Sequence, residues 1–425
     1  MNDKKNQIFT SANVLIPNKE IDMSRWSVVA CDQYTSEQEY WESVKQHVEN
    51  ENSTLHMVFP EIYLEEEGFE TRIENISNSM KKYLADNIFT QYPNSYVYVR
   101  RELANKKVRH GIIGKIDLEH YEYTVGAKPV IRATEGTVLE RIPPRVKIRE
   151  KCPLELPHVM LLIDDEADEI IGGIAKQSES LACIYDFELM QESGHISGYL
   201  LNDDCETLLN QGIEKLANQH EFDARYGTQG EDVLLFAVGD GNHSLATAKK
   251  CYENLKVEIG EKALESEARY ALVEVVNLHD SSLEFEAIHR VVFDVNAEHM
   301  LEKLSDVFQV QNIELLEDND FVMITNHTKK GFHIINKISN LAVGNLQRFI
   351  DDYIAEYGGS VDYIHGESVV TKLCEEGNTV GFLLNSMEKS DLFKTVIMDG
   401  ALPRKTFSMG EACDKRFYLE AREIK

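Results

Sequence analysis

The stretch that most constrains the fold runs from Asp232 to Lys250 and reads DVLLFAVGDGNHSLATAKK. Its apolar run from Val233 to Val238 predicts a strand that is covered on both faces. The turn over residues 239–244 follows, and its glycines allow a sharp bend or the close approach of a ligand. Ser244 is the expected N-cap of the next helix. The sequence therefore predicts a strand, a polar turn and a helix whose first amides face the turn.

This turn presents an acid, an amide, an imidazole and a hydroxyl, from Asp240, Asn242, His243 and Ser244, around the glycine Gly241. Such groups at a helix N-terminus suit a phosphate or another small polar ligand. The alternative is a structural turn in which the Asp and Asn side chains satisfy backbone amides. The spacing alone leaves both interpretations open.

A second polar turn is expected near the N-terminus. The apolar segment 27–31, SVVAC, predicts a strand, and the helical spacing over 37–48 predicts a helix behind a Thr35–Ser36 cap. The polar residues 32–35 then lie between strand and helix. They either contribute to a site or only cap the helix.

Patterning elsewhere predicts a mixed fold. Alternation predicts hairpins over 95–121 and 184–202, while apolar periodicity predicts helices over 69–87, 205–220 and 258–267. Strands are expected over 157–165, 270–278 and 287–295. Interleaved hairpins and βα units favour an α+β fold with mixed sheets. We expect an α/β core over 1–295 with the ligand site, and a smaller C-terminal α+β region over 296–425 that contributes a loop to it.

Charge and cysteine usage limit the partners. A formal charge of −29 over 425 residues disfavours nonspecific binding to nucleic acid or to an anionic membrane. Seven scattered cysteines without a CxxC pair indicate neither a disulfide framework nor a zinc site, and they fit a reducing cytoplasm. No apolar segment suggests a signal peptide or membrane helix. The expected partners are small anionic molecules, and the chain could form a homo-oligomer.

Familiar enzyme signatures are missing from the sequence. It contains no GxxxxGK[ST], GxGxxG, HExxH or GxSxG motif. A P-loop ATPase, a standard Rossmann enzyme, a zincin and an α/β-hydrolase are therefore unsupported.

A basic segment stands out from this acidic chain. Between Arg132 and Lys151 six bases oppose three acids, a local charge of +3. Arginine forks match phosphate and carboxylate oxygens, and the two prolines at 143–144 are expected to keep the segment extended. The alternative is a surface strip that forms salt bridges with the acidic excess. The candidate ligand-binding residues of this segment are Arg132, Thr137, Arg141 and Arg145, and Glu135 is a candidate base toward a hydroxyl.

Two further candidates lie in the C-terminal third. Arg404, Lys405 and Thr406 follow a turn at 400–403 and present basic and hydroxyl groups on a loop, but the sequence alone favours a solvated loop there. Arg290 lies beside His289 on a predicted strand. A lone histidine on a strand is more often a structural group than a catalyst.

Six segments together resemble the family known as domain of unknown function one thousand and fifteen. They are collinear over nearly the whole chain: VVACDQYTS, RATEGT, FAVGDGNHSLATA, AIHRVV, DYIHG and LPRKTFSMGE. Many members carry Asp-Gly-His-His-Arg where this chain reads 240–244 as Asp-Gly-Asn-His-Ser. That hallmark is similar to the phosphate-handling loop of the ParB and sulfiredoxin superfamily, which includes free-serine kinases. The resemblance implies a ParB/sulfiredoxin-like core, with Asp240 as catalytic acid/base or metal-facing carboxylate, His243 on phosphate and Glu135 as candidate second carboxylate.

The resemblance and the residues together favour a cytoplasmic phosphotransferase acting on a small hydroxylated metabolite. A free amino acid such as serine is the first expected acceptor, with ATP, ADP or another phosphate donor and Mg²⁺ to bridge the phosphates. Ser244 in place of arginine removes a phosphate clamp, which the basic segment could replace. A nucleotide-binding regulator without turnover, or a phosphometabolite hydrolase, is the alternative.

Overall fold

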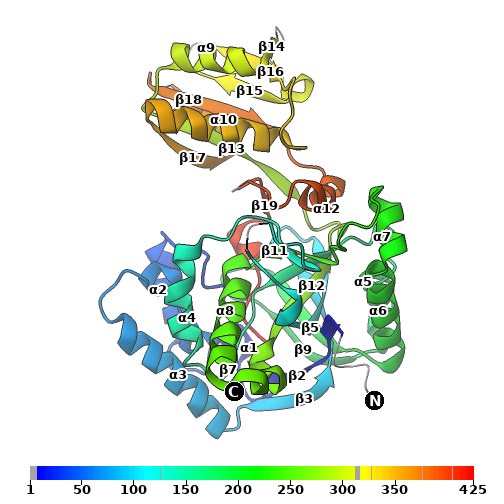
Figure 1. Ribbon diagram of the computed structural model, residues 1–425. Coiled ribbons are helices and arrows are strands. Elements are labelled where there is room, and N and C mark those ends of the chain that lie inside the picture. The colour runs from blue at the N-terminus through cyan, green and yellow to red at the C-terminus, as the bar shows by residue number, and fades with distance from the viewer. Residues whose placement is uncertain (1–6, 125, 312–315, 327, 376, 404) are drawn as a thin grey trace. The chain divides into compact units, whose positions relative to one another are not determined.

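The computed structural model describes residues 7–124, 126–311, 316–326, 328–375, 377–403 and 405–425 (Figure 1). The chain forms two compact units. Unit 1 comprises residues 1–133, 137–283 and 411–425, and unit 2 comprises 134–136 and 284–410. This division differs from the expected boundary near residue 295, because strand β13 already belongs to unit 2 and the last fifteen residues, 411–425, return to unit 1. A pattern read along the chain gives no sign of such a return.

Unit 1 is built on a nine-stranded mixed sheet with the order β6-β11-β8-β12-β5-β4-β10-β9, and β1 pairs with β5. The pairs β6–β11 and β8–β12 are parallel, and the other pairs are antiparallel. The strands are β1 (Phe9–Thr10), β4 (Val97–Glu102), β5 (Val108–Asp117), β6 (Ile131–Ala133), β8 (Met160–Ile163), β9 (Ala182–Glu188), β10 (His195–Leu200), β11 (Phe236–Asp240) and β12 (Tyr270–Asn277). The predicted α+β class and both predicted hairpins are confirmed.

Helices cover this sheet through two apolar cores. One core joins α5, α6 and α8 to one set of strand side chains, and the other joins α2 and α3 to the N- and C-terminal segments. Figure 1 shows α4 and α8 side by side. The helices are α1 (Met23–Trp26), α2 (Gln38–Val48), α3 (Phe69–Ala85), α4 (Ile142–Arg149), α5 (Ile171–Ala175), α6 (Asp203–Leu216), α7 (Gln219–Tyr226) and α8 (Asn242–Ile259). Two short sheets, β2 (Ala12–Pro17) with β3 (Phe89–Ser95) and β7 (Leu154–Glu155) with β20 (Arg422–Glu423), complete the unit.

Several local predictions were wrong. The prolines at 143–144 do not keep their segment extended, because they stand at the first positions of α4, where no amide is needed for an intrahelical bond. Segment 27–31 is no strand, although Val29 forms a bridge with Phe417. The helix after it is preceded by Glu37 and not by the expected Thr35–Ser36 cap. The helix expected over 258–267 is the end of α8 followed by a 3₁₀ turn, Gly260–Glu265.

Unit 2 is a smaller α+β unit around a seven-stranded sheet with the order β14-β16-β15-β18-β13-β17, and β19 pairs with β13. Its described pairs are antiparallel. The strands are β13 (Phe285–Phe293), β14 (Gln309–Gln311), β15 (Phe321–Ile324), β16 (Lys329–His333), β17 (Ser360–His365), β18 (Thr379–Leu384) and β19 (Phe407–Met409). The helices are α9 (Ala297–Val307), α10 (Ala342–Tyr357), α11 (Glu367–Leu373) and α12 (Lys389–Met398).

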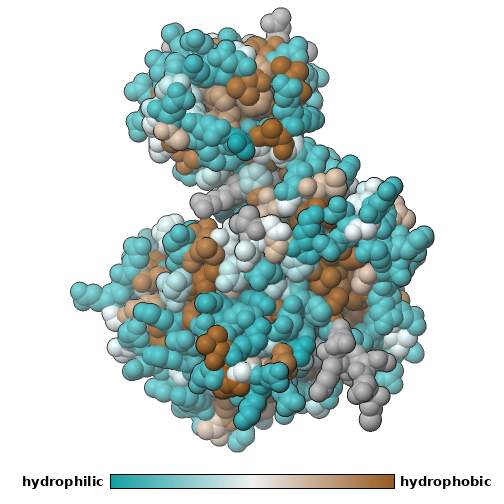
Figure 2. Space-filling model, in the orientation of Figure 1, coloured by the Kyte–Doolittle hydropathy of each residue, from teal (hydrophilic) through white to brown (hydrophobic). Residues whose placement is uncertain are grey.

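The surface is mostly hydrophilic on the face in view, with hydrophobic side chains in small separate groups (Figure 2). Large exposed apolar residues are scattered, for example Val257 near the end of α8 and Leu139 before α4. Isolated residues of this kind are normal on protein surfaces. Among the helices that the structure describes, none is long and apolar enough to cross a membrane.

Candidate functional site

The predicted strand, turn and helix form the centre of the candidate site, with corrected boundaries. Strand β11 begins at Phe236 and not at Val233, and it runs on to Asp240. Gly241, and not Ser244, is the N-cap of α8, and Ser244 lies inside the first turn. Among the described side chains, none caps the first turn of this 18-residue helix. Its first amides and the positive end of its dipole are therefore suited to an anion.

Gly241 is required at this turn for two reasons. Its φ of +80° lies in the left-handed region, which residues with a Cβ adopt at a cost. A Cβ at this position would also lie 2.9 Å from the Cα of Val159, which precedes β8, and 3.4 Å from the imidazole of His158. The turn thus packs directly on the backbone at the start of β8.

Asp240 is the last residue of β11, and its carboxylate lies at the N-terminus of α8. Its Oδ1 accepts a hydrogen bond of 3.0 Å from the amide of Gly241, and its Oδ2 lies 3.5 Å from Nζ of Lys415. The Asp and Lys side chains keep about 20% and 15% of their surface exposed. A carboxylate and an ammonium thus stand together where the sequence predicted a catalytic acid/base.

The next residues of the helix add an imidazole and an amide. His243 Nε2 accepts a hydrogen bond of 3.3 Å from the amide of Val138, so the segment after the RATEGT motif is attached to α8. Asn242 Oδ1 and the hydroxyl of Thr137 are both buried without a hydrogen-bond partner among the described residues. Buried polar atoms of this kind are available to a ligand or to water.

The second polar turn lies beside the first one. The carboxylate of Asp32 has its Oδ1 bonded to Gln33 at 3.0 Å and its Oδ2 at 3.7 Å from Nε2 of His158. Burial acts to raise the pKa of Asp32, but the charges of His158 and Lys415 and the Gln33 hydrogen bond outweigh it and lower that pKa. Lys415 therefore acts on the carboxylates of both turns, those at 32 and 240.

His158 and Lys415 were missed as site residues by sequence reasoning. The imidazole of His158 is fixed on its other side by the hydroxyl of Tyr418, 2.7 Å from Nδ1. That hydroxyl also bonds to Sγ of Cys31 at 3.1 Å. Lys415 lies shortly after the LPRKTFSMGE segment, and this position is the sequence signal that could have identified it. Sequence reasoning pointed to Lys405, within that segment, instead.

Most bases of the basic segment contact protein groups and not an open site. The guanidinium of Arg132 donates to the carbonyls of Pro129, Lys128 and Asp232. Arg145 pairs with Glu61, and Arg149 pairs with the buried Glu155. Lys147 and Lys151 both pair with Glu70, at 3.8 and 3.5 Å. Arg141 is exposed.

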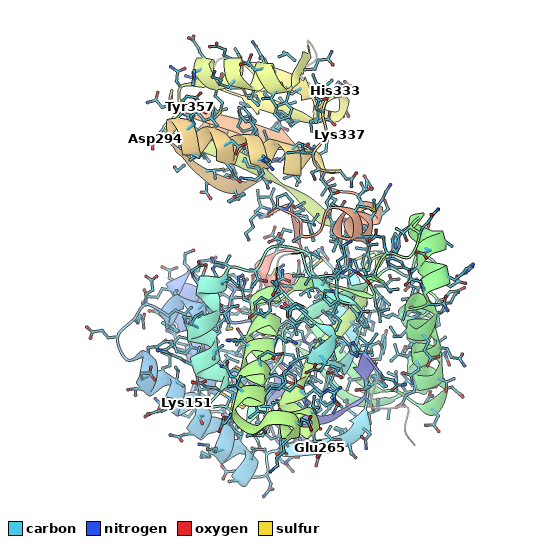
Figure 3. The ribbon with its side chains drawn as sticks, in the orientation of Figure 1. Lys151, Glu265, Asp294, His333, Lys337 and Tyr357 are labelled. Atoms are coloured by element: carbon cyan, nitrogen blue, oxygen red, sulfur yellow. The ribbon has the colours of Figure 1, made fainter. Side chains whose placement is uncertain are left out.

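Figure 3 labels Lys151 near the end of α4 and Glu265 at the end of the turn after α8, away from the β11–α8 turn. The basic segment is thus largely neutralised by the acidic excess. This is the alternative that the sequence left open.

Three other predicted site residues cluster in unit 2. Glu135 forms a parallel bridge with Leu402, and its Oε1 accepts a hydrogen bond of 3.1 Å from the amide of Lys405. Burial raises the pKa of Glu135, although the charge of Lys405 acts against this. Arg290 is fully buried, donates to Gln347 at 3.1 Å, and has a pKa that burial lowers to about 10. Arg404 lies outside the described residues.

The RATEGT and LPRKTFSMGE segments therefore pair with each other, while Asp240, His243 and their neighbours belong to unit 1. That Glu135 and Asp240 share one pocket stays a prediction.

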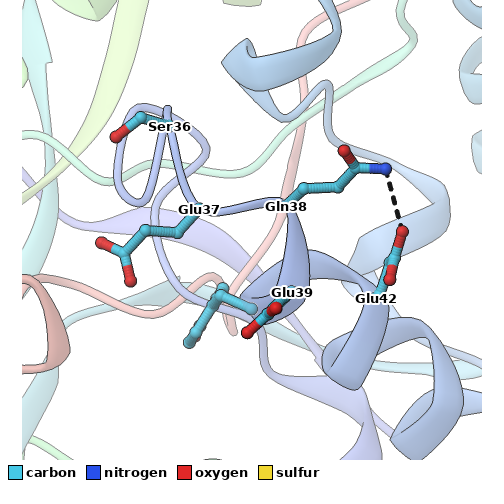
Figure 4. A pocket seen from close by; sticks show the side chains of 6 residues that line it. Ser36, Glu37, Gln38, Glu39 and Glu42 are labelled. Atoms are coloured by element: carbon cyan, nitrogen blue, oxygen red, sulfur yellow. Dashed lines mark hydrogen bonds between the residues drawn. The ribbon is translucent and has the colours of Figure 1, made fainter.

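Over the described ranges, no group of three or more His, Cys, Asp or Glu side chains could hold a metal ion. An open hollow of about 620 Å³ lies at the start of α2 and is lined by Ser36, Glu37, Gln38, Glu39, Tyr40 and Glu42 (Figure 4). Its three glutamates make it unsuitable for an anionic ligand.

Comparison with known proteins supports the family assignment. The model of the family described as "Protein of unknown function (DUF1015)" matches residues 15–353. No curated protein matches the chain. Among solved structures, a free serine kinase in complex with AMP is 12% identical with a TM-score of 0.39, covering 75% of this chain and 93% of that one.

A conserved hypothetical protein from Pyrococcus furiosus is 11% identical with a TM-score of 0.36, covering 75% and 97% of the two chains. SbnI with a C-terminal truncation, from Staphylococcus aureus, is 12% identical with a TM-score of 0.36, covering 72% and 82%.

Proposed function

The chain belongs to the DUF1015 family, and from the geometry of its own site we propose that it transfers a phosphoryl group to the hydroxyl of a small metabolite. The donor is a nucleotide or another phosphate compound, and serine is the first acceptor to test. The observation that carries the proposal is the N-terminus of α8, opened by Gly241 and flanked by the Asp240–Lys415 pair. This arrangement places anion-binding amides, a carboxylate and an ammonium at one point.

The N-terminus of α8 is the proposed phosphate subsite. Its first amides point out of the helix, and the helix dipole favours negative charge there. The imidazole of His243, fixed by the Val138 amide, stands in the first turn and is a further contact for phosphate oxygens. Such preorganised donors stabilise the charge that develops during phosphoryl transfer.

Asp240 is the proposed base for the acceptor. Its carboxylate takes the hydroxyl proton as the acceptor oxygen forms its bond to phosphorus, while the bond from phosphorus to the donor oxygen breaks and the electron pair leaves with the donor. The ammonium of Lys415, 3.5 Å from Oδ2, holds this carboxylate in place and offsets the charge of the transferred group.

Mg²⁺ fits this donor set, since it typically takes one or two protein carboxylates together with substrate phosphates, where it would neutralise phosphate charge. Asp240 is the carboxylate that would hold it. Glu135 remains the proposed second carboxylate only if unit 2 brings it to the same ligand. The proposal includes a cytoplasmic location. All seven cysteines lie among the described residues, and each is a free thiol.

The test is incubation of the pure protein with ATP, ADP or pyrophosphate, a magnesium salt and a set of hydroxylated acceptors that includes serine. Phosphorus NMR would detect the phosphorylated product. We expect product with at least one donor and a loss on the order of 10²-fold for Asp240→Asn, because the proton acceptor is removed. Asp186→Asn, which removes a carboxylate from an exposed His–Asp pair of the same unit, is the matched control.

Absence of product with every donor, or an unchanged rate in Asp240→Asn, would contradict the proposal. Two other outcomes would assign a different function. A ligand that raises the melting temperature and stays chemically unchanged would indicate a binding protein. Phosphate release without an acceptor would indicate a hydrolase.

A further inference from the structure

Several charged side chains lie beside the β11–α8 turn. Two carboxylates, Asp32 and Asp240, face one ammonium, that of Lys415. The adjacent pair of Arg145 with Glu61 is neutral as a whole. The imidazole of His158 lies 3.7 Å from Oδ2 of Asp32 and 3.4 Å from the place a Cβ on Gly241 would take, so Asp32 lies beside the turn that opens α8.

The two carboxylates differ in their ionic partners. The ammonium of Lys415 lies 3.5 Å from the carboxylate of Asp240 and forms its ion pair with that residue. The imidazole of His158 is 3.7 Å from Oδ2 of Asp32, which exceeds a hydrogen-bond distance. The hydroxyl of Tyr418 holds the other imidazole nitrogen at 2.7 Å and so fixes the ring.

Asp32 is also the most exposed member of this group. Its side chain keeps 29% of its surface exposed, against 8% for His158, 20% for Asp240 and 15% for Lys415. The Gln33 amide donates to Oδ1 at 3.0 Å, whereas Oδ2 has the imidazole of His158 at the longer distance of 3.7 Å. An ionised, oriented and partly exposed carboxylate is the group that recognises a cation by a charge-assisted hydrogen bond.

We propose that Asp32 binds a protonated amine of the acceptor, so that the acceptors are amino alcohols and hydroxy amino acids and not uncharged polyols or hydroxy acids. The inference rests on the proposed phosphoryl transfer, because it identifies Asp240 as the group that takes the hydroxyl proton. The amine then lies at Asp32 and the hydroxyl at Asp240, on the two sides of Lys415.

The experiment compares binding of matched ligands to the full-length protein by calorimetry. Serine and 3-hydroxypropanoate share a carboxylate and a hydroxyl, and only serine has an amine. Ethanolamine and ethylene glycol form the second pair. Because hydrogen bonds to charged groups are among the stronger ones, we expect the wild type to bind the amine-bearing member about tenfold more tightly or better.

The isosteric Asp32→Asn should remove this preference, and the control Asp186→Asn should keep it. Thermal unfolding followed by tryptophan fluorescence shows whether each variant is folded. If Asp32→Asn does not fold, the wild-type comparison and Asp32→Glu, which keeps the charge, still decide. A wild type that binds none of the four ligands, or binds both members of a pair equally, overturns the inference.

The outcomes separate the inference from the proposed function. Product formation together with an amine preference that survives in Asp32→Asn overturns the role of Asp32 and leaves the phosphotransferase standing. An amine preference that depends on Asp32, with no product from any donor, supports the amine site and overturns the phosphotransferase.

Discussion

Gly241→Ala tests whether the turn before α8 depends on its close approach to β8. The chain offers a matched control in Gly68, which is the N-cap of α3. Both glycines are left-handed, with φ of +80° and +90°, and among the described side chains none caps either helix. They differ in their surroundings: a Cβ at Gly68 meets nothing within 4 Å, and a Cβ at Gly241 would lie 2.9 Å from the Cα of Val159.

The expected costs follow from this difference. Both substitutions place an alanine in the left-handed region, which costs roughly 1–2 kcal/mol. At Gly241 the Cβ also overlaps backbone that the sheet holds, because the carbonyl of Val159 accepts the Glu274 amide at 3.0 Å. Overpacking of this kind costs typically about 1–3 kcal/mol. We therefore expect Gly68→Ala to lose about 1–2 kcal/mol and Gly241→Ala about 2–5 kcal/mol.

Denaturant unfolding followed by tryptophan fluorescence measures the difference. The chain has two tryptophans, and both Trp26 and Trp41 are fully buried in unit 1, so the signal reports the unit that contains both glycines. The midpoint of Gly241→Ala should lie clearly below that of Gly68→Ala at an unchanged slope. Equal midpoints for the two variants would refute the packing argument.

Three further substitutions separate structural from functional charges. Burial acts to raise the pKa of Glu155, but the guanidinium groups of Arg422 and Arg149 outweigh it and lower that pKa. The stability this carboxylate contributes is therefore present above its ordinary pKa of about 4.3 and is lost as pH falls through the lowered folded value. Glu155→Gln should cost about 3–5 kcal/mol at pH 7 in denaturant unfolding, with the difference from wild type shrinking in acid; a difference that does not change with pH would contradict this. Arg132→Met should lower stability without changing ligand affinity in calorimetry, because its donors hold three carbonyls; lost affinity at full stability would reverse that assignment. Lys415→Met should slow phosphoryl transfer on the order of 10²-fold, whereas Lys215→Met, which breaks a 3.5 Å pair with Glu169, should leave the rate unchanged.

Local patterns predicted those parts of the fold whose stabilising contacts are close in sequence. The hairpins β4–β5 and β9–β10 follow from alternation, and α3 and α6 follow from apolar periodicity. The turn at 240–244 was predicted for the same reason, because the strand, the two glycines and the helix that define it follow one another directly in the sequence. Its helix cap was assigned three residues late, because serine is the commoner cap and the packing of Gly241 on β8 is a tertiary contact.

The remaining site residues come from distant parts of the chain, and no local pattern predicts their meeting. Lys415 lies in the segment that returns to unit 1 after residues 284–410 have formed unit 2. His158 precedes β8, which pairs with β11 antiparallel, so the end of one strand meets the start of the other. The sequence indicated polar turns at 32 and 240 but contained no sign that one lysine would act on both.

The phosphate clamp expected from the basic segment illustrates the same point. The hallmark expected from the family resemblance has arginine at the position of Ser244, and the net charge of residues 132–151 suggested a replacement. The structure instead pairs Arg145 with Glu61, Lys147 and Lys151 with Glu70, and ties Arg132 to carbonyls, so these cations are already compensated. Lys415 differs from these cations, because its partner at 3.5 Å is a carboxylate that is itself part of the site. A bound anionic ligand can therefore share the ammonium of Lys415 with that carboxylate. In the proposed phosphoryl transfer, the main-chain amides of α8 and the ammonium of Lys415 therefore take the role expected of an arginine in this turn.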